Sequence, residues 1–126
     1  MKAVLDTSAL LALIFGEPGA DRVVQRIDGA RVSSVNLAEF AGKLVERGYA
    51  DADAEAAALR LPVAVVPFDA AQALAAGLLR RATRPAGLSL GDRACLALAQ
   101  ADGLPAVTAD RAWGGLDLGV PVEVIR

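Results

Sequence analysis

The chain opens with the stretch Lys2-Ala3-Val4-Leu5-Asp6-Thr7-Ser8, in which a short apolar run meets an acidic residue and two hydroxyl residues. The apolar run predicts a buried strand over 2–6, and Thr7 and Ser8 can cap a helix that continues to about Phe15. A strand that passes directly into a helix is the building unit of an α/β sheet. This stretch therefore predicts the first strand of a parallel sheet, with Asp6 at its carboxyl end, where such sheets bind ligands.

The rest of the chain repeats this alternation of short β-like runs and longer helical runs. Further strands are predicted at 30–33, 63–66, 105–109 and 120–125, and further helices at 18–27, 35–47, 51–60, 69–82 and 89–101. The run 63–66 is β-branched and apolar, which predicts a buried strand. No repeat, low-complexity segment or linker interrupts the pattern, so residues 1–126 are predicted to form a single α/β domain.

The composition excludes several classes of protein. Hydrophobic residues make up 55% of the 126 residues, which favours a folded domain with a real core. The longest apolar stretch, 9–15, is too short to cross a bilayer, and an acid at position 6 argues against a signal peptide. The lone Cys95 is expected to be a buried, reduced thiol in a cytoplasmic protein. Because the chain has no histidine, Ser-His and Cys-His catalytic pairs are excluded.

The positive charges are almost all arginine. The chain has 13 basic residues, of which only Lys2 and Lys43 are lysine, and its net charge is −2. A net negative charge argues weakly against a general nucleic-acid coat, although arginine can still bind phosphate locally in a bidentate manner. The arginine content is explained more simply by a bias shared with alanine and glycine. A small group at Arg80, Arg81 and Arg84 fits the last turn of a helix slightly better than a binding patch.

Asp6 and Asp92 occupy positions that suit a carboxylate ligand of a metal ion. Asp6 is interpreted as functional rather than as a simple cap, because Thr7 and Ser8 can cap the following helix themselves. Asp92 lies on a helix whose neighbours at plus three and plus four are Cys95 and Leu96. An ionised carboxylate on such an apolar stripe is costly unless a cation binds it, although a first-turn acid is also favoured by the helix dipole.

Two further acids are ambiguous when taken singly. Glu39 falls on the polar side of its helix, where it can pair with Lys43, complete a capping box with Asn36, or simply face solvent. Asp110 can be a plain helix cap or a ligand at a strand's carboxyl end. Together with Asp6 and Asp92, they predict a site of several carboxylates that needs a divalent ion, and oxygen ligands favour Mg²⁺ or Mn²⁺ over zinc.

Four segments, taken in order and spacing, resemble the PIN-domain nucleases, specifically the VapC-type toxins of toxin–antitoxin pairs. The resemblance covers nearly the whole chain. The segments are Val4-Leu5-Asp6-Thr7-Ser8-Ala9, Ser34-Val35-Asn36-Leu37-Ala38-Glu39, Leu90-Gly91-Asp92-Arg93-Ala94-Cys95-Leu96-Ala97 and Val107-Thr108-Ala109-Asp110-Arg111-Ala112-Trp113.

This resemblance implies a three-layer α/β fold with a five-stranded parallel sheet in the order 3-2-1-4-5 and helices on both faces. It implies a Mg²⁺- or Mn²⁺-dependent endoribonuclease that cleaves structured RNA, such as transfer or ribosomal RNA. It also implies a cognate antitoxin of the VapB type and a homodimer. The family's catalytic and metal-binding acids match Asp6, Glu39, Asp92 and Asp110, and its supporting polar positions match Thr7 and Thr108.

RNA that approaches an acidic site needs neighbouring positive charge, and Arg93 and Arg111 directly follow two of the acids. Both are predicted as RNA-binding residues. Three other functions remain open: a haloacid dehalogenase-like phosphatase, a receiver-type phospho-acceptor domain, and an inactive binding module. The first normally has a second Asp where this chain has Ser8. The second needs a lysine near the last strand, and neither Lys2 nor Lys43 is there.

Overall fold

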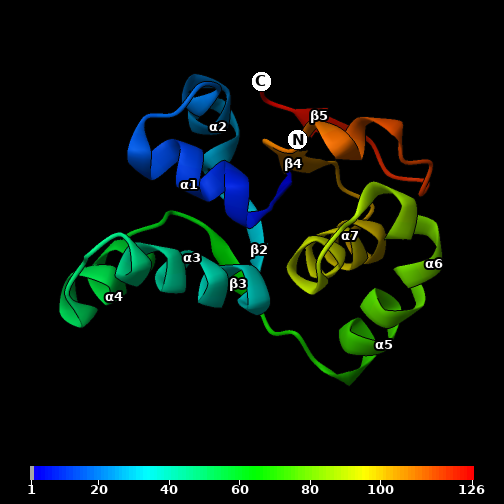
Figure 1. Cartoon of the computed structure of the whole chain (residues 1–126), viewed down its shortest axis with the longest axis horizontal. Helices are drawn as coiled ribbons and strands as arrows, with labels where there is room; N and C mark the ends of the chain where they lie inside the picture. The colour runs from blue at the N-terminus through cyan, green and yellow to red at the C-terminus, as the bar shows by residue number, and fades with distance from the viewer. Residues whose placement is uncertain (1) are drawn as a thin grey trace.

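The computed structural model of the chain describes residues 2–126 and contains one parallel five-stranded sheet (Figure 1). The strands are β1 (Val4–Leu5), β2 (Arg31–Ser33), β3 (Ala64–Val66), β4 (Ala106–Thr108) and β5 (Val122–Val124). Their order across the sheet is β3-β2-β1-β4-β5, and all four neighbouring pairs are parallel. The predicted order 3-2-1-4-5 is therefore confirmed, and β1 lies in the centre with its carboxyl end next to that of β4.

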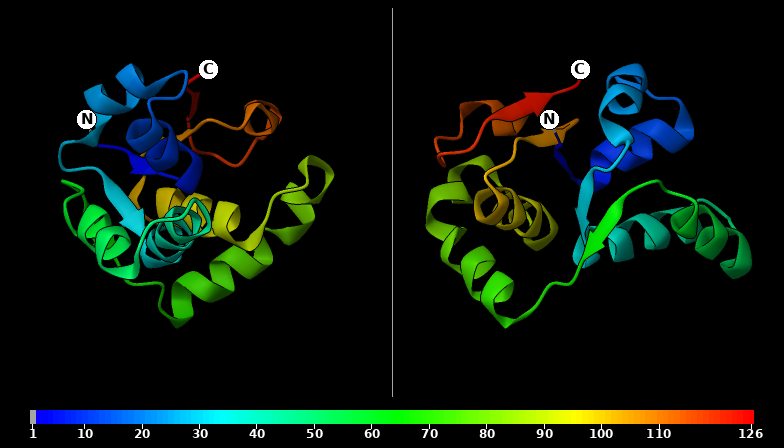
Figure 2. Two further views of the ribbon diagram at one scale, coloured as in Figure 1. Left: turned by 60° about the vertical axis from the view of Figure 1, so that its left-hand side comes forward. Right: turned by 180° about the vertical axis from the view of Figure 1, so that it is seen from behind.

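Helices cover both faces of this sheet, as predicted (Figures 1 and 2). The helices are α1 (Thr7–Phe15), α2 (Ala20–Ile27), α3 (Ser34–Glu46), α4 (Asp51–Leu59), α5 (Ala70–Leu78), α6 (Arg80–Thr83) and α7 (Leu90–Asp102), with short 3₁₀ turns η1 (Arg84–Ala86) and η2 (Arg111–Gly115). Alternation along the central strand explains the layers: Leu5 packs into the apolar cluster under α1–α4, and Val4 into the cluster under α5–α7. None of the described helices is long and apolar enough to cross a membrane.

Two elements differ from their predictions. The strand predicted as buried at 63–66 is β3, which lies at the edge of the sheet and leaves Val65 44% exposed. β-branched composition alone does not distinguish an edge strand from a central one, because both favour the same side chains. The helix predicted over 69–82 is divided into α5 and α6 at Leu79, so the chain bends before the three arginines at 80, 81 and 84.

The entry to α2 also differs from its prediction. Pro18 does not open the helix; Gly19 is its N-cap, with a φ of 95°, and the helix begins at Ala20. A Cβ atom at position 19 would lie 2.6 Å from the carbonyl oxygen of Ile125. Position 19 therefore requires glycine both for its backbone conformation and for the close approach of the C-terminal segment.

Candidate metal centre

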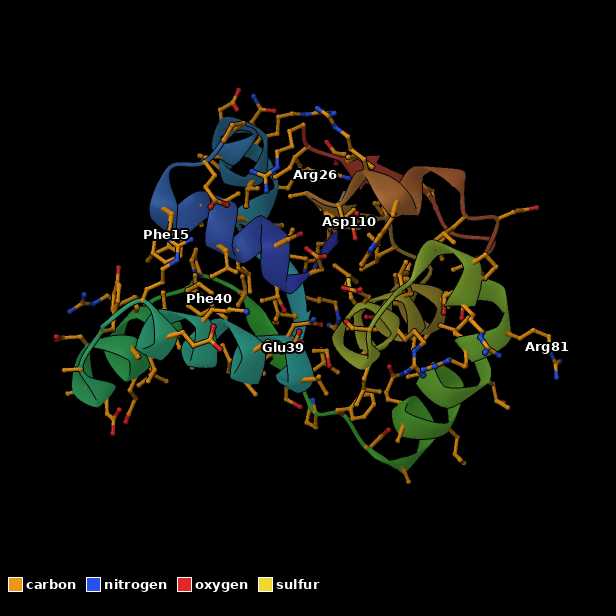
Figure 3. All side chains as sticks on the ribbon, in the orientation of Figure 1. Phe15, Arg26, Glu39, Phe40, Arg81 and Asp110 are labelled. Atoms are coloured by element: carbon orange, nitrogen blue, oxygen red, sulfur yellow. The ribbon has the colours of Figure 1, made fainter. Side chains whose placement is uncertain are left out.

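All four predicted carboxylates line one cleft at the carboxyl edge of the sheet. The cleft has a volume of about 450 Å³, and its lining includes Asp6, Glu39, Asp92 and Asp110. Asp6 follows β1, Asp110 follows β4, and the other two acids come from α3 and α7. Glu39 and Asp110 lie in the central part of the molecule, between the two helical sides (Figure 3). The fold therefore brings acids from four distant segments to one place.

Asp6 is the most deeply buried of the four, with only 2% of its surface exposed. Its Oδ1 accepts hydrogen bonds from the backbone N–H of Ala9 (2.9 Å) and the hydroxyl of Ser8 (2.7 Å), and its Oδ2 accepts from Thr108 (2.8 Å). Asp6 is therefore the N-cap of α1, and the prediction that Thr7 and Ser8 would cap this helix is wrong. Capping and a place in the cleft are compatible because a carboxylate has two oxygens.

Burial governs the ionisation of this carboxyl. Desolvation raises the pKa of Asp6 from 3.8 to about 6, against the lowering effect of its three hydrogen bonds, and the negative charge of Asp92 raises it further. The nearby Cys95 thiol is fully buried, and desolvation, with smaller effects from Asp6 and Asp92, raises its pKa well above the ordinary value. Cys95 is therefore an inert thiol beneath the site, as its apolar surroundings predicted.

The Glu39 carboxylate is held by hydrogen bonds from Thr7 and Asn36. Its Oε1 accepts a hydrogen bond from the hydroxyl of Thr7 (2.7 Å) and a longer one from the side-chain amide of Asn36 (3.4 Å). Lys43 instead forms an ion pair with Glu46 at 3.2 Å. Of the alternatives for Glu39, the pairing with Lys43 is therefore not formed, and neither is a capping box with Asn36, because Ser33 is the N-cap of α3. The side chain is half-buried, so it does not simply face solvent either.

Gly91 is a site residue that the sequence analysis missed. A Cβ atom added at this position would overlap the Glu39 carboxylate, so α7 can lie against that side chain only with glycine here. Asn36, which is 1% exposed, also holds α7 close to α3, because its side-chain amide donates a hydrogen bond of 3.0 Å to the Gly91 carbonyl. The available signal was a glycine inside a predicted helix, a costly choice that usually has a packing or functional reason.

Asp92 and Asp110 each cap a helix and also line the cleft, which are the two roles that the sequence left open. Asp92 completes a capping box with Ser89, in which the Ser89 N–H donates to Oδ2 (2.8 Å) and the Ser89 hydroxyl accepts from the Asp92 N–H (3.2 Å). Asp110 is exposed and caps η2 by accepting from the N–H of Ala112 (2.9 Å). Each therefore serves its own helix and also lines the cleft.

The donor chemistry of the cleft fits a hard divalent cation. Among residues 2–126, no three His, Cys, Asp or Glu side chains approach closely enough to form a ready-made ligand group. Each of the four carboxylates is held by hydroxyl, amide or backbone donors. The acids nevertheless offer only oxygen ligands, and the Asp92 charge already raises the pKa of Asp6. Such repulsion is relieved by a cation of the Mg²⁺ or Mn²⁺ type.

The two arginines predicted to bind RNA lie in different surroundings. Arg93 is only 8% exposed, and its guanidinium donates to the carbonyl of Ala76 (3.1 Å), so it packs against α5 and we leave it out of any RNA surface. Consecutive residues on a helix point about 100° apart, which is why Arg93 turns away from the cleft that Asp92 faces. Arg111 is exposed and donates to the carbonyl of Arg126 (3.3 Å).

The structural role of Arg93 gives a testable expectation. Arg93→Ala removes a charged hydrogen bond and the packing of a long buried stem, and we expect it to lower the free energy of unfolding by about 2 kcal/mol. Urea unfolding measures this change. Below the unfolding transition, the RNA affinity of the variant should equal that of the unmodified protein. A large loss of RNA affinity with normal stability would contradict this assignment.

Comparison with known proteins places this geometry in a family. The model of the PIN domain matches residues 3–117. A comparison with curated proteins found no match. Among solved structures, the sarcin-ricin loop cleaving toxin VapC20 of Mycobacterium tuberculosis is similar with a TM-score of 0.75 and 24% identity, over 95% of this chain and 99% of that one. A toxin–antitoxin complex from Klebsiella pneumoniae is similar with a TM-score of 0.73 and 20% identity, over 94% and 95%.

A third similar structure is the DNA-bound VapBC of Salmonella typhimurium, with a TM-score of 0.73 and 20% identity over 100% of this chain and 99% of that one. These identities are low, so the structural likeness speaks for the fold. The family assignment rests on the domain match, which covers the segments that contribute Asp6, Glu39, Asp92 and Asp110. On this match over most of its length, the chain belongs to the PIN domain family.

Proposed function

We propose that this protein is a metal-dependent endoribonuclease that acts as the toxin of a toxin–antitoxin pair. The observation that carries the proposal is the convergence of Asp6, Glu39, Asp92 and Asp110 on one cleft within a PIN fold. The similar structures support the biological setting, since they include toxin–antitoxin complexes and one toxin described as cleaving the sarcin-ricin loop.

We assign Mg²⁺ or Mn²⁺ to this cleft, where one or two such ions would activate water and neutralise charge on the scissile phosphate. The residues of the chain hold the ligand oxygens in place. Asp6 is fixed by three donors, and Glu39 by Thr7 and Asn36. Thr108 supports Asp6 directly, so both residues matched to supporting polar positions donate to a site carboxylate. The exposed Asp110 completes the set from the solvent side.

The partners proposed for this chain are folded RNA, a VapB-type antitoxin and a second copy of the chain. An apolar groove of about 470 Å³ between α3 and α4, lined by residues that include Leu37, Val45 and Leu59, supports an apolar protein contact beside the site. Leu59 is 75% exposed and Val45 is 46% exposed there, and neighbouring exposed apolar side chains mark a protein contact where a single one would not. A cytoplasmic location agrees with the single reduced thiol.

The chemistry of the product ends tests this proposal. An attack by activated water in line with the leaving oxygen yields 5′-phosphate and 3′-hydroxyl ends and does not require the ribose 2′-hydroxyl. With total bacterial transfer RNA as the probe, cleavage should require Mg²⁺ or Mn²⁺ and stop with EDTA. Ligation of the products without prior phosphorylation reports the 5′-phosphate. Cleavage that persists in EDTA and leaves 2′,3′-cyclic phosphates would refute the proposal.

A further inference from the structure

A second cleft lies on the α5–α6 side of the molecule, and three of its six lining residues are arginine. It has a volume of about 610 Å³ and is formed by Gly77, Leu78, Arg80, Arg81, Arg84 and Pro85. All six residues are exposed. Figure 3 shows Arg81 extending outward from α6, on the side of the molecule away from Glu39. This arginine cleft is therefore separate from the acidic cleft.

The segment that forms the arginine cleft carries charge of one sign along the sequence. Residues 70–91 contain three arginines and no acidic residue, a formal charge of +3 in a protein whose net charge is −2. Among residues 2–126, the ion pairs that the structure contains use other basic residues. The three guanidinium groups are thus available to an external anion.

The stability of α6 does not explain why three arginines occur at positions 80, 81 and 84. The N–H of Arg84 bonds to the carbonyl of Arg80, so the two residues lie one turn apart on the same side. Like charges at this spacing destabilise a helix by a few tenths of a kcal/mol, whereas one cation in the last turn is enough to complement the dipole. The dipole interpretation favoured by the sequence alone therefore explains one of these arginines and leaves the others without a structural reason.

The arginine cleft lies next to α5, which packs against the helix that contributes Asp92. The Thr83 hydroxyl donates to the carbonyl of Leu79 (2.8 Å), the residue between α5 and α6, and so stabilises the turn that carries the arginines. Arg93 donates to the Ala76 carbonyl and thereby joins α5 to the first turns of α7, next to Asp92. Ala76, Leu79 and Leu96 also belong to one apolar cluster, so the packing of α5 against α7 does not depend on that hydrogen bond alone.

We propose that the arginine cleft binds the phosphate backbone of the RNA substrate at a distance from the cleaved phosphate. Guanidinium groups form bidentate contacts with phosphate, and Leu78, which is 84% exposed, offers an apolar surface to a ribose or base. An acidic protein needs such a local patch, because its overall field repels nucleic acid. This inference rests on the proposed function and adds the surface that retains the substrate.

Arg80→Gln/Arg84→Gln tests the proposal against the control Lys2→Gln/Arg60→Gln, which removes the same charge from exposed residues outside both clefts. The probe is labelled total bacterial transfer RNA, titrated over a range of salt concentrations. The arginine variant should bind about tenfold more weakly, and its plot of log Kd against log salt should be shallower by about 1.4 to 1.8 for two lost phosphate contacts. Its KM should rise with kcat nearly unchanged.

The outcomes separate this inference from the proposed function. Equal salt slopes and equal KM values in the two variants, with normal cleavage, would overturn the inference alone. Binding of transfer RNA through these arginines, with cleavage of neither transfer nor ribosomal RNA by the unmodified protein in Mg²⁺ or Mn²⁺, would support the inference and refute the nuclease. Loss of affinity for a polyglutamate peptide without loss of affinity for RNA would assign the cleft to an acidic protein segment and also overturn the inference.

Discussion

Asp6→Asn is expected to lower the rate of RNA cleavage by about a thousandfold, which corresponds to roughly 4 kcal/mol of transition-state stabilisation. The amide has no negative charge, so it binds a divalent cation poorly. It still fits the site, because its carbonyl oxygen can accept the bonds from Ala9 and Ser8 that cap α1. The Thr108 hydroxyl can rotate to accept from the new amide group. The loss is therefore expected in a folded protein.

The same substitution should stabilise the protein in the absence of divalent ions. The pKa of Asp6 is about 6 in the folded chain against 3.8 for the free side chain, so the folded state binds the proton more tightly. This contribution is fully present below pH 3.8 and is lost as the pH rises through 6, at a total cost of roughly 3 kcal/mol. In EDTA, the unmodified protein should therefore lose stability between pH 4 and pH 7, and Asp6→Asn should not.

Urea unfolding in EDTA at pH 5 and pH 7.5 measures this difference, and cleavage of transfer RNA measures the activity. We expect Asp6→Asn to be the more stable protein at pH 7.5, by a margin that is smaller by about 1.5 kcal/mol at pH 5. Added Mg²⁺ should stabilise the unmodified protein and leave the stability of Asp6→Asn unchanged. Asp117→Asn, at an exposed acid outside the cleft, is the control and should change neither property. Undiminished cleavage by Asp6→Asn would contradict the assignment.

The sequence predicted the sheet correctly because its strands are short apolar runs bounded by clear breaks. It did not predict the edge position of β3, since an edge strand and a central strand attract the same β-branched residues. It also joined α5 to α6, because alanine, leucine and arginine all favour a helix and Gly77, the local signal two residues before the bend at Leu79, was given no weight. Pairing within the sheet and packing between helices settle these features, and both are tertiary effects.

The acidic cleft was predictable to the extent that its acids follow strands or interrupt apolar helices. Asp6 and Asp110 were expected at one edge because parallel strands end there, whereas the argument that Asp6 was not needed as a cap was wrong. The partners of the acids were not predictable, since Thr7, Asn36 and Glu39 meet only when α1 packs against α3. Asp92 and Asp110 also show that a capping role and a site role are compatible, although the sequence analysis weighed them as alternatives.

Gly91→Ala is expected to reduce cleavage about a hundredfold without destabilising the fold. The new methyl group would occupy the space of the Glu39 carboxylate, and that carboxylate must move because it is the end of a flexible side chain. Its movement breaks the hydrogen bond of 2.7 Å from Thr7 and displaces a proposed metal ligand. Alanine itself favours the first turn of α7 over glycine by roughly 0.5–1 kcal/mol, so the free energy of unfolding should stay equal or rise.

Circular dichroism and urea unfolding report the fold of this variant, and titration with Mn²⁺ followed by electron paramagnetic resonance reports its metal affinity. The expected signature is normal or raised stability together with weaker Mn²⁺ binding and slower cleavage. Gly114→Ala is a matched control, because a Cβ atom at that position has no neighbour within 4 Å. It should leave metal affinity and cleavage unchanged.

A double-mutant cycle with Glu39→Ala decides whether Gly91 acts through that carboxylate. Once the Glu39 side chain is removed, a methyl group at position 91 has nothing to displace, so the second substitution should add no further loss. The two effects on Mn²⁺ affinity and on cleavage should therefore be strongly non-additive. Additive losses would show that Gly91→Ala disturbs the packing of α7 against α3 and that glycine at this position does not position Glu39.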